Sequence, residues 1–239
     1  MSSALAVARK EFKTFFQSPI AYIVIGVFLL VLGWFYFSPL FLGGTASLRS
    51  FFGLAPILFM VFAPAVTMRL LAEERKSGTL ELLLSMPIKD WEVVMGKFTA
   101  ALAMVAVALL WTLPYPISVS SLTVKGVSFD WGPVLGGYFG LLLLASSFLA
   151  LGLWASALSR NQIVGFIIGL LLCFSFYFVD KFAFFLPTSL AEVLQFLSVD
   201  YHFENIARGV FDTRDILFYL SLTAAGLMLT TRSLSAARQ

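Results

Sequence analysis

The chain has 239 residues, of which 60% are hydrophobic and 12% are charged, and its mean hydropathy is +0.94. Soluble globular domains are about 25% charged, so this composition excludes that class and indicates an integral membrane protein. The Lys and Arg residues behind the formal net charge of +3 flank apolar runs, which favours a role in membrane topology over a nucleic-acid surface.

The first predicted element is an amphipathic helix over Ser2–Gln17. At 100° per residue one face is apolar, with Leu5, Ala8, Phe12, Phe15 and Phe16. The opposite face is polar, with Arg9, Lys10, Lys13 and Gln17. Because a spanning run follows, we expect an interfacial helix on the inner leaflet, with its basic face toward anionic headgroups. The alternative is a plain basic anchor that only sets the topology.

Six runs are long and apolar enough to span a bilayer, which takes roughly 20 residues. They are Ile20–Leu42, Phe51–Met68, Phe98–Leu122, Val134–Leu158, Gln162–Val179 and Ile216–Thr231. None of these runs contains Lys, Arg, Asp, Glu or His. We therefore predict an all-α integral membrane protein with six transmembrane helices, which forms a single membrane domain over residues 1–239.

Six spans place both termini on one side of the membrane. Most of the basic residues fall on that side: Arg9, Lys10, Lys13, Arg69, Arg75, Lys76, Lys89, Lys97, Arg160, Arg232 and Arg238. The other side holds Arg49, Lys125, Lys181, Arg208 and Arg214. Lys and Arg favour the cytoplasmic side, so we expect both termini and the loop between the second and third spans to be cytoplasmic.

This loop is charged but patterned like a folded element. Leu70–Ala72 are expected to continue the second helix into the cytoplasm, until Gly78 ends it with a positive φ. A short helix over Thr79–Ser85 follows, and Pro87 ends it. Asp90 is the expected N-cap of the third helix.

The short helix has an apolar face formed by Leu80, Leu83 and Leu84, which so small a loop cannot bury. The leucines need either the lipid interface or a groove on another protein. Four acids make an anionic membrane surface unfavourable: Glu73, Glu74, Glu81 and Glu92. We therefore predict that the leucine face docks in a protein groove.

The longest outer segment is Lys181–Arg214, which starts with aromatic residues and turns at Pro187. A seventh span after this turn is disfavoured by Glu192 and Gln195, and it would carry the C-terminus outside. We expect short helices that dip into the outer leaflet and pack against the bundle or a partner subunit, because protein must bury backbone at that depth. Asp212 is the expected N-cap of the last helix.

Two glycine pairs, Gly136 with Gly140 and Gly165 with Gly169, have the spacing of close helix contacts in membranes. Glycine as ordinary membrane filler explains them equally well. The short connection Ser159–Asn161 predicts that the fourth and fifth helices are antiparallel neighbours.

The uncharged spans argue against an ion-coupled transporter or an intramembrane enzyme, since both usually need ionisable groups inside the bilayer. The sequence has no H-E-x-x-H, no Cys and His cluster and no G-x-x-x-x-G-K-[ST]. His202 is the only histidine, and we expect it to act as a hydrogen-bonding residue. We predict that the chain is not an enzyme, binds no metal and does not hydrolyse nucleotide itself. A passive channel or scaffold survives this test.

The inner loop at residues 73–88 resembles a loop of the type-2 ABC exporter (ABC-2) permeases. Its sequence is E-E-R-K-S-G-T-L-E-L-L-L-S-M-P-I. In that family this loop contains the coupling helix, which sits in a cleft of the ATP-binding subunit. The resemblance covers nearly the whole chain: a connecting helix (1–18), six spans, the coupling loop (73–90) and an outer gate segment (181–214) with re-entrant helices.

A second motif narrows the resemblance. Residues 200–215, D-Y-H-F-E-N-I-A-R-G-V-F-D-T-R-D, are similar to the gliding-motility-associated (Gld-type) permease. The nitrous-oxide-reductase maturation (Nos-type) permease is a close relative of that type. Neither motif specifies a substrate.

The resemblance assigns roles to particular positions. Those that would bind the ATP-binding subunit are Glu73, Glu74, Arg75, Gly78, Thr79, Leu80, Leu83, Leu84 and Pro87. Those of the outer gate would be Phe184, Phe185, Pro187, Tyr201, His202, Phe203 and Glu204. The outer segment is too small for a receptor domain, so any periplasmic reach would come from an auxiliary subunit.

The resemblance implies a multi-pass permease of the cell inner membrane that couples ATP hydrolysis to export of a hydrophobic or lipid-linked substrate. Its implied partners are an ABC ATP-binding subunit, which would hold the ATP and Mg, and a second permease copy or a related permease. The chain itself would bind no cofactor and no nucleic acid. The alternative is a mechanotransmitter, which drives a periplasmic partner without moving a substrate.

Overall fold

The computed structural model of the protein describes residues 3–43, 47–81, 87–122, 129–185 and 187–237. Its helices are α1 (Ser3–Gln17), α2 (Pro19–Gly43), α3 (Arg49–Ser77), α5 (Asp90–Leu110), α6 (Pro114–Leu122), α7 (Trp131–Leu158), α8 (Gln162–Phe178), the 3-10 helix η1 (Val179–Phe185), α9 (Thr188–Leu197), α10 (Val199–Ala207) and α11 (Thr213–Ala237). Within the described residues the regular structure is entirely helical. Six helical stretches are long and apolar enough to cross a membrane, which confirms the predicted class of all-α integral membrane protein.

The third predicted span consists of two consecutive helices, α5 and α6. Helix α5 ends at Leu110, and α6 starts at Pro114 after a turn. Proline lacks the N–H that would continue the ladder, and it pushes the preceding residue out of the helical region. The predicted third span over Phe98–Leu122 is thus present within Asp90–Leu122, and Pro114 follows the turn that divides it into two helices.

Aromatic stacking holds α6 against the bundle after this break. The rings of Tyr115 and Tyr36 stack with their centroids 5.7 Å apart, and Phe51 meets Tyr115 edge-on at 6.0 Å. The Tyr115 hydroxyl donates a hydrogen bond to the carbonyl of Leu29 in α2, 3.3 Å away. These contacts join α6 to both α2 and α3.

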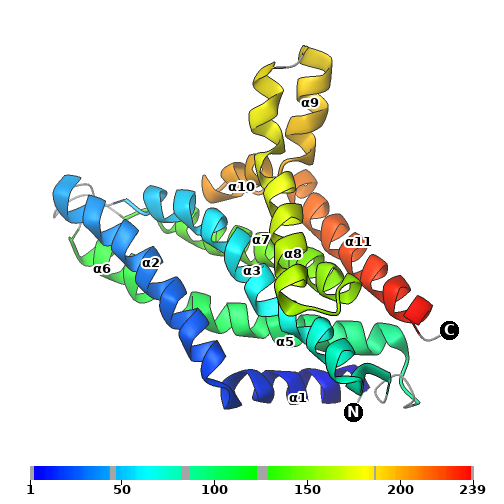
Figure 1. The fold of residues 1–239 in the computed structure, drawn as a ribbon. Coiled ribbons are helices and arrows are strands. Elements are labelled where there is room, and N and C mark those ends of the chain that lie inside the picture. Colours follow the sequence, from blue (N-terminus) through cyan, green and yellow to red (C-terminus); the bar gives the residue numbers. More distant parts are fainter. Residues whose placement is uncertain (1–2, 44–46, 82–86, 123–128, 186, 238–239) are drawn as a thin grey trace.

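Helix α7 lies at the centre of the bundle and contacts α3, α5, α8, α10 and α11 (Figure 1). In its most apolar stretch 78% of the residues are buried, against 29% in α2, 22% in α8 and 28% in α11. The last three helices therefore lie at the periphery of the chain. As the short turn predicted, α7 and α8 are neighbours.

The glycine pairs are sites of close approach. A Cβ added to Gly136 would lie 2.6 Å from the carbonyl oxygen of Ile206, and one added to Gly169 would lie 3.2 Å from Pro64 Cβ. At Gly140 the nearest atom, on Ile206, would be 3.0 Å away. Contact thus explains these three glycines better than filler does. A Cβ at Gly165 would make only ordinary contacts, from 3.5 Å.

The outer segment consists of η1, α9 and α10. Helix α8 continues through η1 and turns back into α9, and this hairpin projects from the top of the molecule in Figure 1. Helix α10 lies at its base and packs on α7 and α11. The predicted short helices are confirmed. Because α9 has only 10 residues, the alternative of a seventh span is wrong.

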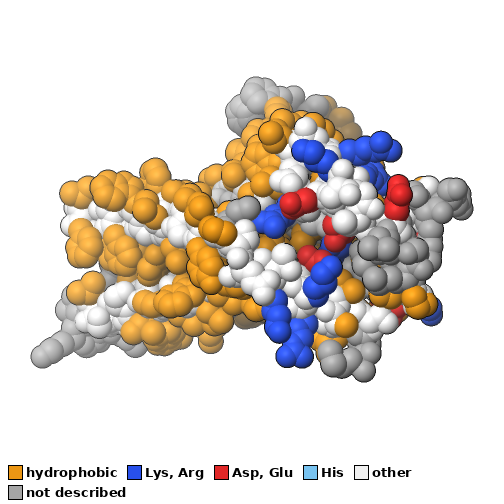
Figure 2. Space-filling model, turned by 60° about the horizontal axis from the view of Figure 1, so that its bottom comes forward, with side chains coloured by type: hydrophobic (Ala, Val, Ile, Leu, Met, Phe, Trp, Pro, Cys, Tyr) orange, Lys and Arg blue, Asp and Glu red, His pale blue; other side chains and the backbone are white. Residues whose placement is uncertain are grey.

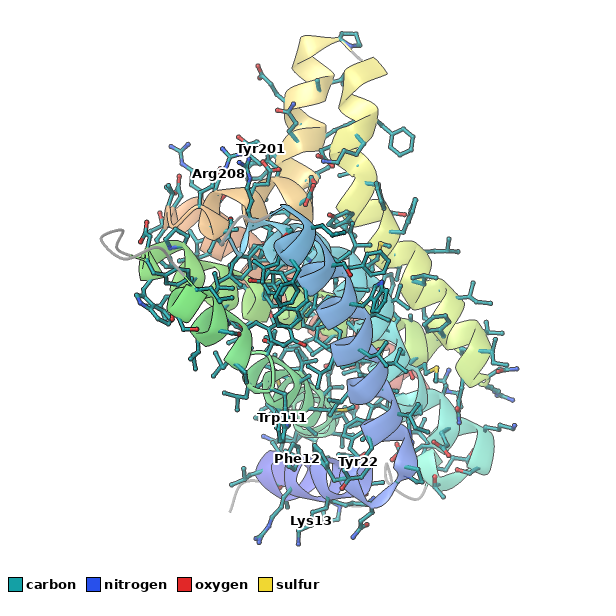
Figure 3. The ribbon with its side chains drawn as sticks, turned by 90° about the vertical axis from the view of Figure 1, so that its left-hand side faces the viewer. Phe12, Lys13, Tyr22, Trp111, Tyr201 and Arg208 are labelled. Carbon is teal, nitrogen blue, oxygen red and sulfur yellow. The ribbon has the colours of Figure 1, made fainter. Side chains whose placement is uncertain are left out.

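Helix α1 runs beside α5 at the bottom of Figure 1. It buries Val7 and Phe15, while Arg9, Lys10 and Lys13 are exposed. Figure 3 shows Lys13 pointing away from the spans, on the side opposite Phe12. The predicted amphipathic helix is confirmed, and its place at the inner leaflet stays a prediction.

Candidate functional site

Helix α3 ends at Ser77, directly before Gly78, as the sequence predicts. Gly78 follows the last helical residue with φ of 72°, in the left-handed region that favours glycine. A Cβ added at Gly78 would meet nothing within 4 Å, so the backbone angle and not space requires glycine here. The Ser77 and Thr79 hydroxyls both donate to the Glu74 carbonyl, at 3.3 and 3.4 Å. The C-terminal turn of α3 is thus satisfied locally.

After Gly78 the chain is helical again over residues 79–81. The rest of the predicted short helix, with Leu83 and Leu84, lies outside the described residues. Leu80 is only 4% exposed and belongs to the apolar core of this chain. The prediction that the loop could not bury its leucines is therefore wrong for Leu80. The prediction considered only the loop itself, whereas the apolar core of the whole chain buries Leu80.

The start of α5 also differs in detail from the prediction. Lys89 occupies the N-cap position, and its backbone N–H donates to Glu92 Oε2 at 3.1 Å. Asp90 is the first helical residue and not the cap. Its Oδ2 instead accepts a hydrogen bond of 2.8 Å from the Ser235 hydroxyl, which links α5 to the end of α11.

A buried lysine joins three helices at this end of the molecule. Lys97 of α5 has a fully buried side chain, and its Nζ lies 2.7 Å from Glu74 Oε1 of α3 and 3.1 Å from Glu11 Oε1 of α1. Both carboxylates are also largely buried, with 19% and 12% of their side chains exposed. A charge this deep needs compensation, and here two acids supply it. The three helices are thus tied at one point.

Around this point lies a cavity of about 220 Å³ between α1 and the end of α3. Glu11, Arg69, Glu73 and Glu74 contribute to its lining. Arg69 forms an ion pair with Glu73, at 3.4 Å. Arg69 Nη1 and Glu74 Oε2 are buried and have no hydrogen-bond partner among the described residues. The space beside the junction is therefore polar.

A second clamp holds α3 where it leaves the bundle. The Ser156 hydroxyl of α7 donates to the Met68 carbonyl at 2.9 Å. It accepts from the backbone N–H groups of Leu71 and Ala72, at 3.2 and 3.0 Å. A side chain inserted into a helix ladder in this way is a known cause of bending. One hydroxyl thus connects α7 to three backbone groups of α3.

The candidate docking positions differ in their exposure. Glu73, Gly78 and Thr79 are exposed, Arg75 is half-buried, and Glu74 is committed to Lys97. Pro87 is exposed at the far end of the loop. Figure 2 shows Lys, Arg, Asp and Glu side chains gathered on one half of the bottom face, whereas the other half is hydrophobic. The exposed positions lie at the charged end of the molecule.

The outer-gate positions divide between two faces of α10. His202 and Phe203 are buried, whereas Tyr201 and Glu204 are exposed, and Glu204 pairs with Arg208 at 2.9 Å. Figure 3 shows Tyr201 and Arg208 on the outside of the molecule. These residues therefore do not form one cluster.

The remaining gate positions lie on the projecting hairpin. Pro187 is the N-cap of α9 and is exposed. The backbone of Phe184 and Phe185 belongs to η1, and their side chains lie outside the described part of the structure.

The His202 ring of α10 contacts both α9 and α11. Its Nδ1 lies 2.6 Å from Asp215 Oδ1 of α11, and its Nε2 lies 2.8 Å from the Phe196 carbonyl of α9. The ring stacks on Phe218, with centroids 4.1 Å apart. The prediction that His202 forms hydrogen bonds is confirmed. At the start of α11, Asp212 accepts from the Arg214 N–H as the predicted cap.

A larger cavity, of about 690 Å³, lies beside α10 at the outer ends of α3, α7 and α8. Phe52, Val134 and Phe203 give it an apolar part, and Arg49 and Asp130 give it charged groups. The outer segment therefore covers a hollow and not a solid surface.

Three functional positions are absent from the sequence-based prediction: Lys97, Ser156 and the Asp215 partner of His202. Lys97 stands directly before an apolar run, where a lysine ordinarily marks the membrane boundary, so nothing in the sequence indicated its burial. Ser156 carried no signal, because small polar residues are common in membrane helices. Asp215 lies in the first turn of a predicted helix, where an acid is common, so its contact with His202 could not be anticipated.

Residues 45–237 match the model of a protein family described as ABC-2 family transporter protein. The matched range includes all the candidate positions named above except Glu11 of α1. A comparison with curated proteins gives no match.

Proposed function

The chain belongs to the ABC-2 family of transporter proteins and is a membrane permease component of an ABC transporter, and we propose that it couples ATP hydrolysis by a separate subunit to conformational work across the membrane. The family implies an ABC ATP-binding partner. In this proposal ATP and Mg bind to that partner, and this chain is not catalytic. The whole chain acts as one membrane domain, with a connecting helix (1–18), a coupling loop (73–90) and an outer gate (181–214).

The observation that carries this proposal is the Lys97 junction. The coupling loop follows α3 directly, and Glu74 near its start is tied through Lys97 to α1 and α5. A push on the loop would therefore reach three helices together. Packed interfaces with discrete arrangements can pass such a displacement to distant elements.

The ATP-binding subunit would contact the exposed positions of the loop. Glu73, Gly78 and Thr79 are available, and Leu83 with Leu84 would supply the apolar contact. Leu80 takes a different role, because its burial anchors the loop to this chain.

The loop and both termini would face the cytoplasm, with the protein in the inner membrane. Three observations support this orientation. The basic residues concentrate at the loop end of the spans. The six candidate spans are even in number. Both termini lie toward the same lower part of Figure 1 as the end of α3.

A second permease would complete the membrane unit. The low burial of α2 and α8 leaves long apolar faces on the outside of this chain. Lipid covers such faces in part, and a second copy or a related permease would cover the rest. An auxiliary subunit would supply any larger periplasmic part.

Within the family we place the protein, as a proposal, with the gliding-motility-associated type. The supporting feature is the motif at residues 200–215, whose His202 and Asp215 form a buried pair. The test is purification of the tagged complex with its ATP-binding subunit. A large periplasmic subunit held in fixed ratio would support the type, and a complex of permease and ATPase alone would contradict it.

The coupling proposal is tested with Leu83→Asp, and Leu83→Met is the matched control. Both chains are purified with the ATP-binding subunit and placed in lipid nanodiscs. We expect the Asp variant to lose co-purification or the stimulation of ATPase activity, because a carboxylate cannot enter an apolar groove. The Met variant should keep both. An Asp variant with normal binding and stimulation would overturn the proposal.

A further inference from the structure

His202 lies in a setting that fixes its protons. It is 1% exposed and Asp215 is 3% exposed, so neither side chain exchanges freely with water. Both ring nitrogens have an oxygen within hydrogen-bond distance, at 2.6 Å for Nδ1 and 2.8 Å for Nε2. The positions of these oxygens therefore indicate which of the two ring nitrogens carry a proton.

The Nε2 contact requires a proton on that nitrogen, because the Phe196 carbonyl can only accept a hydrogen bond. A neutral imidazole would then leave Nδ1 bare, facing an ionised carboxylate that also only accepts. Two acceptors held 2.6 Å apart would repel each other. The observed contact thus needs one further proton between Nδ1 and Oδ1.

The other oxygen of Asp215 leads to the same conclusion. Asp215 Oδ2 is buried and has no hydrogen-bond partner among the described residues. A buried carboxylate with a single hydrogen bond and no counter-charge is costly. A positive charge on His202 removes most of this cost.

The surrounding charges do not replace that proton. The titratable and charged groups on the elements around the pair are Tyr138, Cys173, Tyr177, Asp180, Lys181, Glu192, Asp200, Tyr201, Glu204, Arg208, Asp212, Arg214, Tyr219 and Arg232. Lys181 binds Asp180 and Asp200, and Arg208 binds Glu204. Arg214 is exposed and Arg232 lies near the other end of α11. Among the described residues, the Lys and Arg side chains on these elements are therefore paired with other acids, exposed, or distant from Asp215.

We propose that His202 and Asp215 form a proton-binding site that holds the outer segment on α11. In the bound state the imidazolium donates from Nδ1 to Asp215 and from Nε2 to the Phe196 carbonyl, which joins α9, α10 and α11. Loss of the proton leaves one of these contacts without a hydrogen, and α10 loosens from either α9 or α11. The outer segment thus responds to the pH on its side of the membrane.

The protonation is measured by NMR of the full chain in nanodiscs, with 15N-labelled histidine and a cleaved tag that contains no histidine. Because the chain has a single His, only one imidazole contributes signals, and they should disappear in His202→Asn. At pH 7 we expect a proton on both ring nitrogens, because each of them faces an oxygen that accepts a hydrogen bond. An unprotonated Nδ1 at this pH would overturn the proposal.

The coupling to structure is measured by amide hydrogen exchange, corrected for the intrinsic effect of pH. We expect protection of α10 to fall in the parent chain as the pH is raised, because loss of the proton removes one of the two contacts that the His202 ring makes. The buried helix α7 serves as the internal reference. In His202→Asn and Asp215→Asn, α10 should be less protected and independent of pH. Parent protection that does not change with pH would overturn the proposal, whatever the ATP-binding subunit does.

Discussion

Lys97 of α5 and Glu74 of α3 are joined by a buried ion pair of 2.7 Å, and Glu74 is the second residue of the motif at residues 73–88. Glu74 therefore serves the interior of this chain, although it belongs to the motif that would bind the ATP-binding subunit. Within the motif, Glu74 thus ties α3 to α5, whereas Ser77, Gly78 and Thr79 are exposed. Variants of the buried residues should therefore lower the stability of the chain, whereas variants of the exposed residues should only reduce its coupling to the ATP-binding subunit.

The first prediction concerns the junction itself. Lys97→Met keeps the size and apolar stem of the side chain but leaves Glu11 and Glu74 uncompensated. Removing one partner of a buried ion pair costs about 3–5 kcal/mol, so we expect a clearly lower thermal unfolding temperature in detergent. Adding Glu11→Gln and Glu74→Gln to Lys97→Met should restore most of the loss. A Lys97→Met chain as stable as the parent would show that the junction contributes nothing.

The second prediction concerns the turn at Gly78. A β-branched residue is strongly disfavoured at a φ of 72°, at a cost of about 1–2 kcal/mol, so Gly78→Val should shift the direction of the loop and reduce ATPase stimulation. Gly78→Asn is the matched control, since Asn tolerates this region. Gly53→Ala, in a helix with open space around the new methyl, should have no effect. Equal stimulation by the Val and Asn variants would argue against a role for the turn geometry.

The third prediction concerns the contact of α7 with α3. A Cβ at Gly152 would lie 2.3 Å from Thr67 Oγ1 and 3.3 Å from Pro64 Cα. Overpacking of this kind costs about 1–3 kcal/mol, so Gly152→Ala should lower the unfolding temperature. Thr67→Ala removes the nearest atom, so the double variant with Gly152→Ala and Thr67→Ala should regain part of the lost stability. No rescue would mean that the backbone at Pro64, and not the threonine, sets the limit.

The fourth prediction concerns topology. Cys173 is the only cysteine and is fully buried, so the parent chain should react little with a membrane-impermeant maleimide. Lys76→Cys should react in inside-out vesicles and Tyr201→Cys in right-side-out vesicles, because both positions are exposed at opposite ends of the molecule. The reverse pattern would invert the proposed orientation.

Local rules predicted much of this structure from the sequence. The spans follow from runs of apolar residues, and the end of α3 follows from a charged stretch that stops at Gly78. The short outer helices follow from Pro187 and the polar residues behind it. Each of these features depends on neighbours in the chain, which a single sequence displays.

The features that could not be predicted from the sequence depend on contacts between residues that are distant in the chain. Lys97 and Glu11 are 86 positions apart, and His202 meets Asp215 only because α10 folds back on α11. Leu80 was assigned to the surface because its burial depends on where α3 ends in space. Sequence periodicity reports which face of a helix is apolar, but not which neighbour covers it.

The Ser156 hydroxyl supports α3 at one point, so the part of the helix beyond that point can act as a lever and Ser156 as its fulcrum. It grips the helix at Met68, Leu71 and Ala72, and the arm beyond it ends at Gly78. A load at the tip of the arm would be resisted at the fulcrum, and the fulcrum belongs to α7, the central helix. Force from the loop would therefore enter the middle of the bundle through this serine, in addition to the Lys97 junction with α1 and α5.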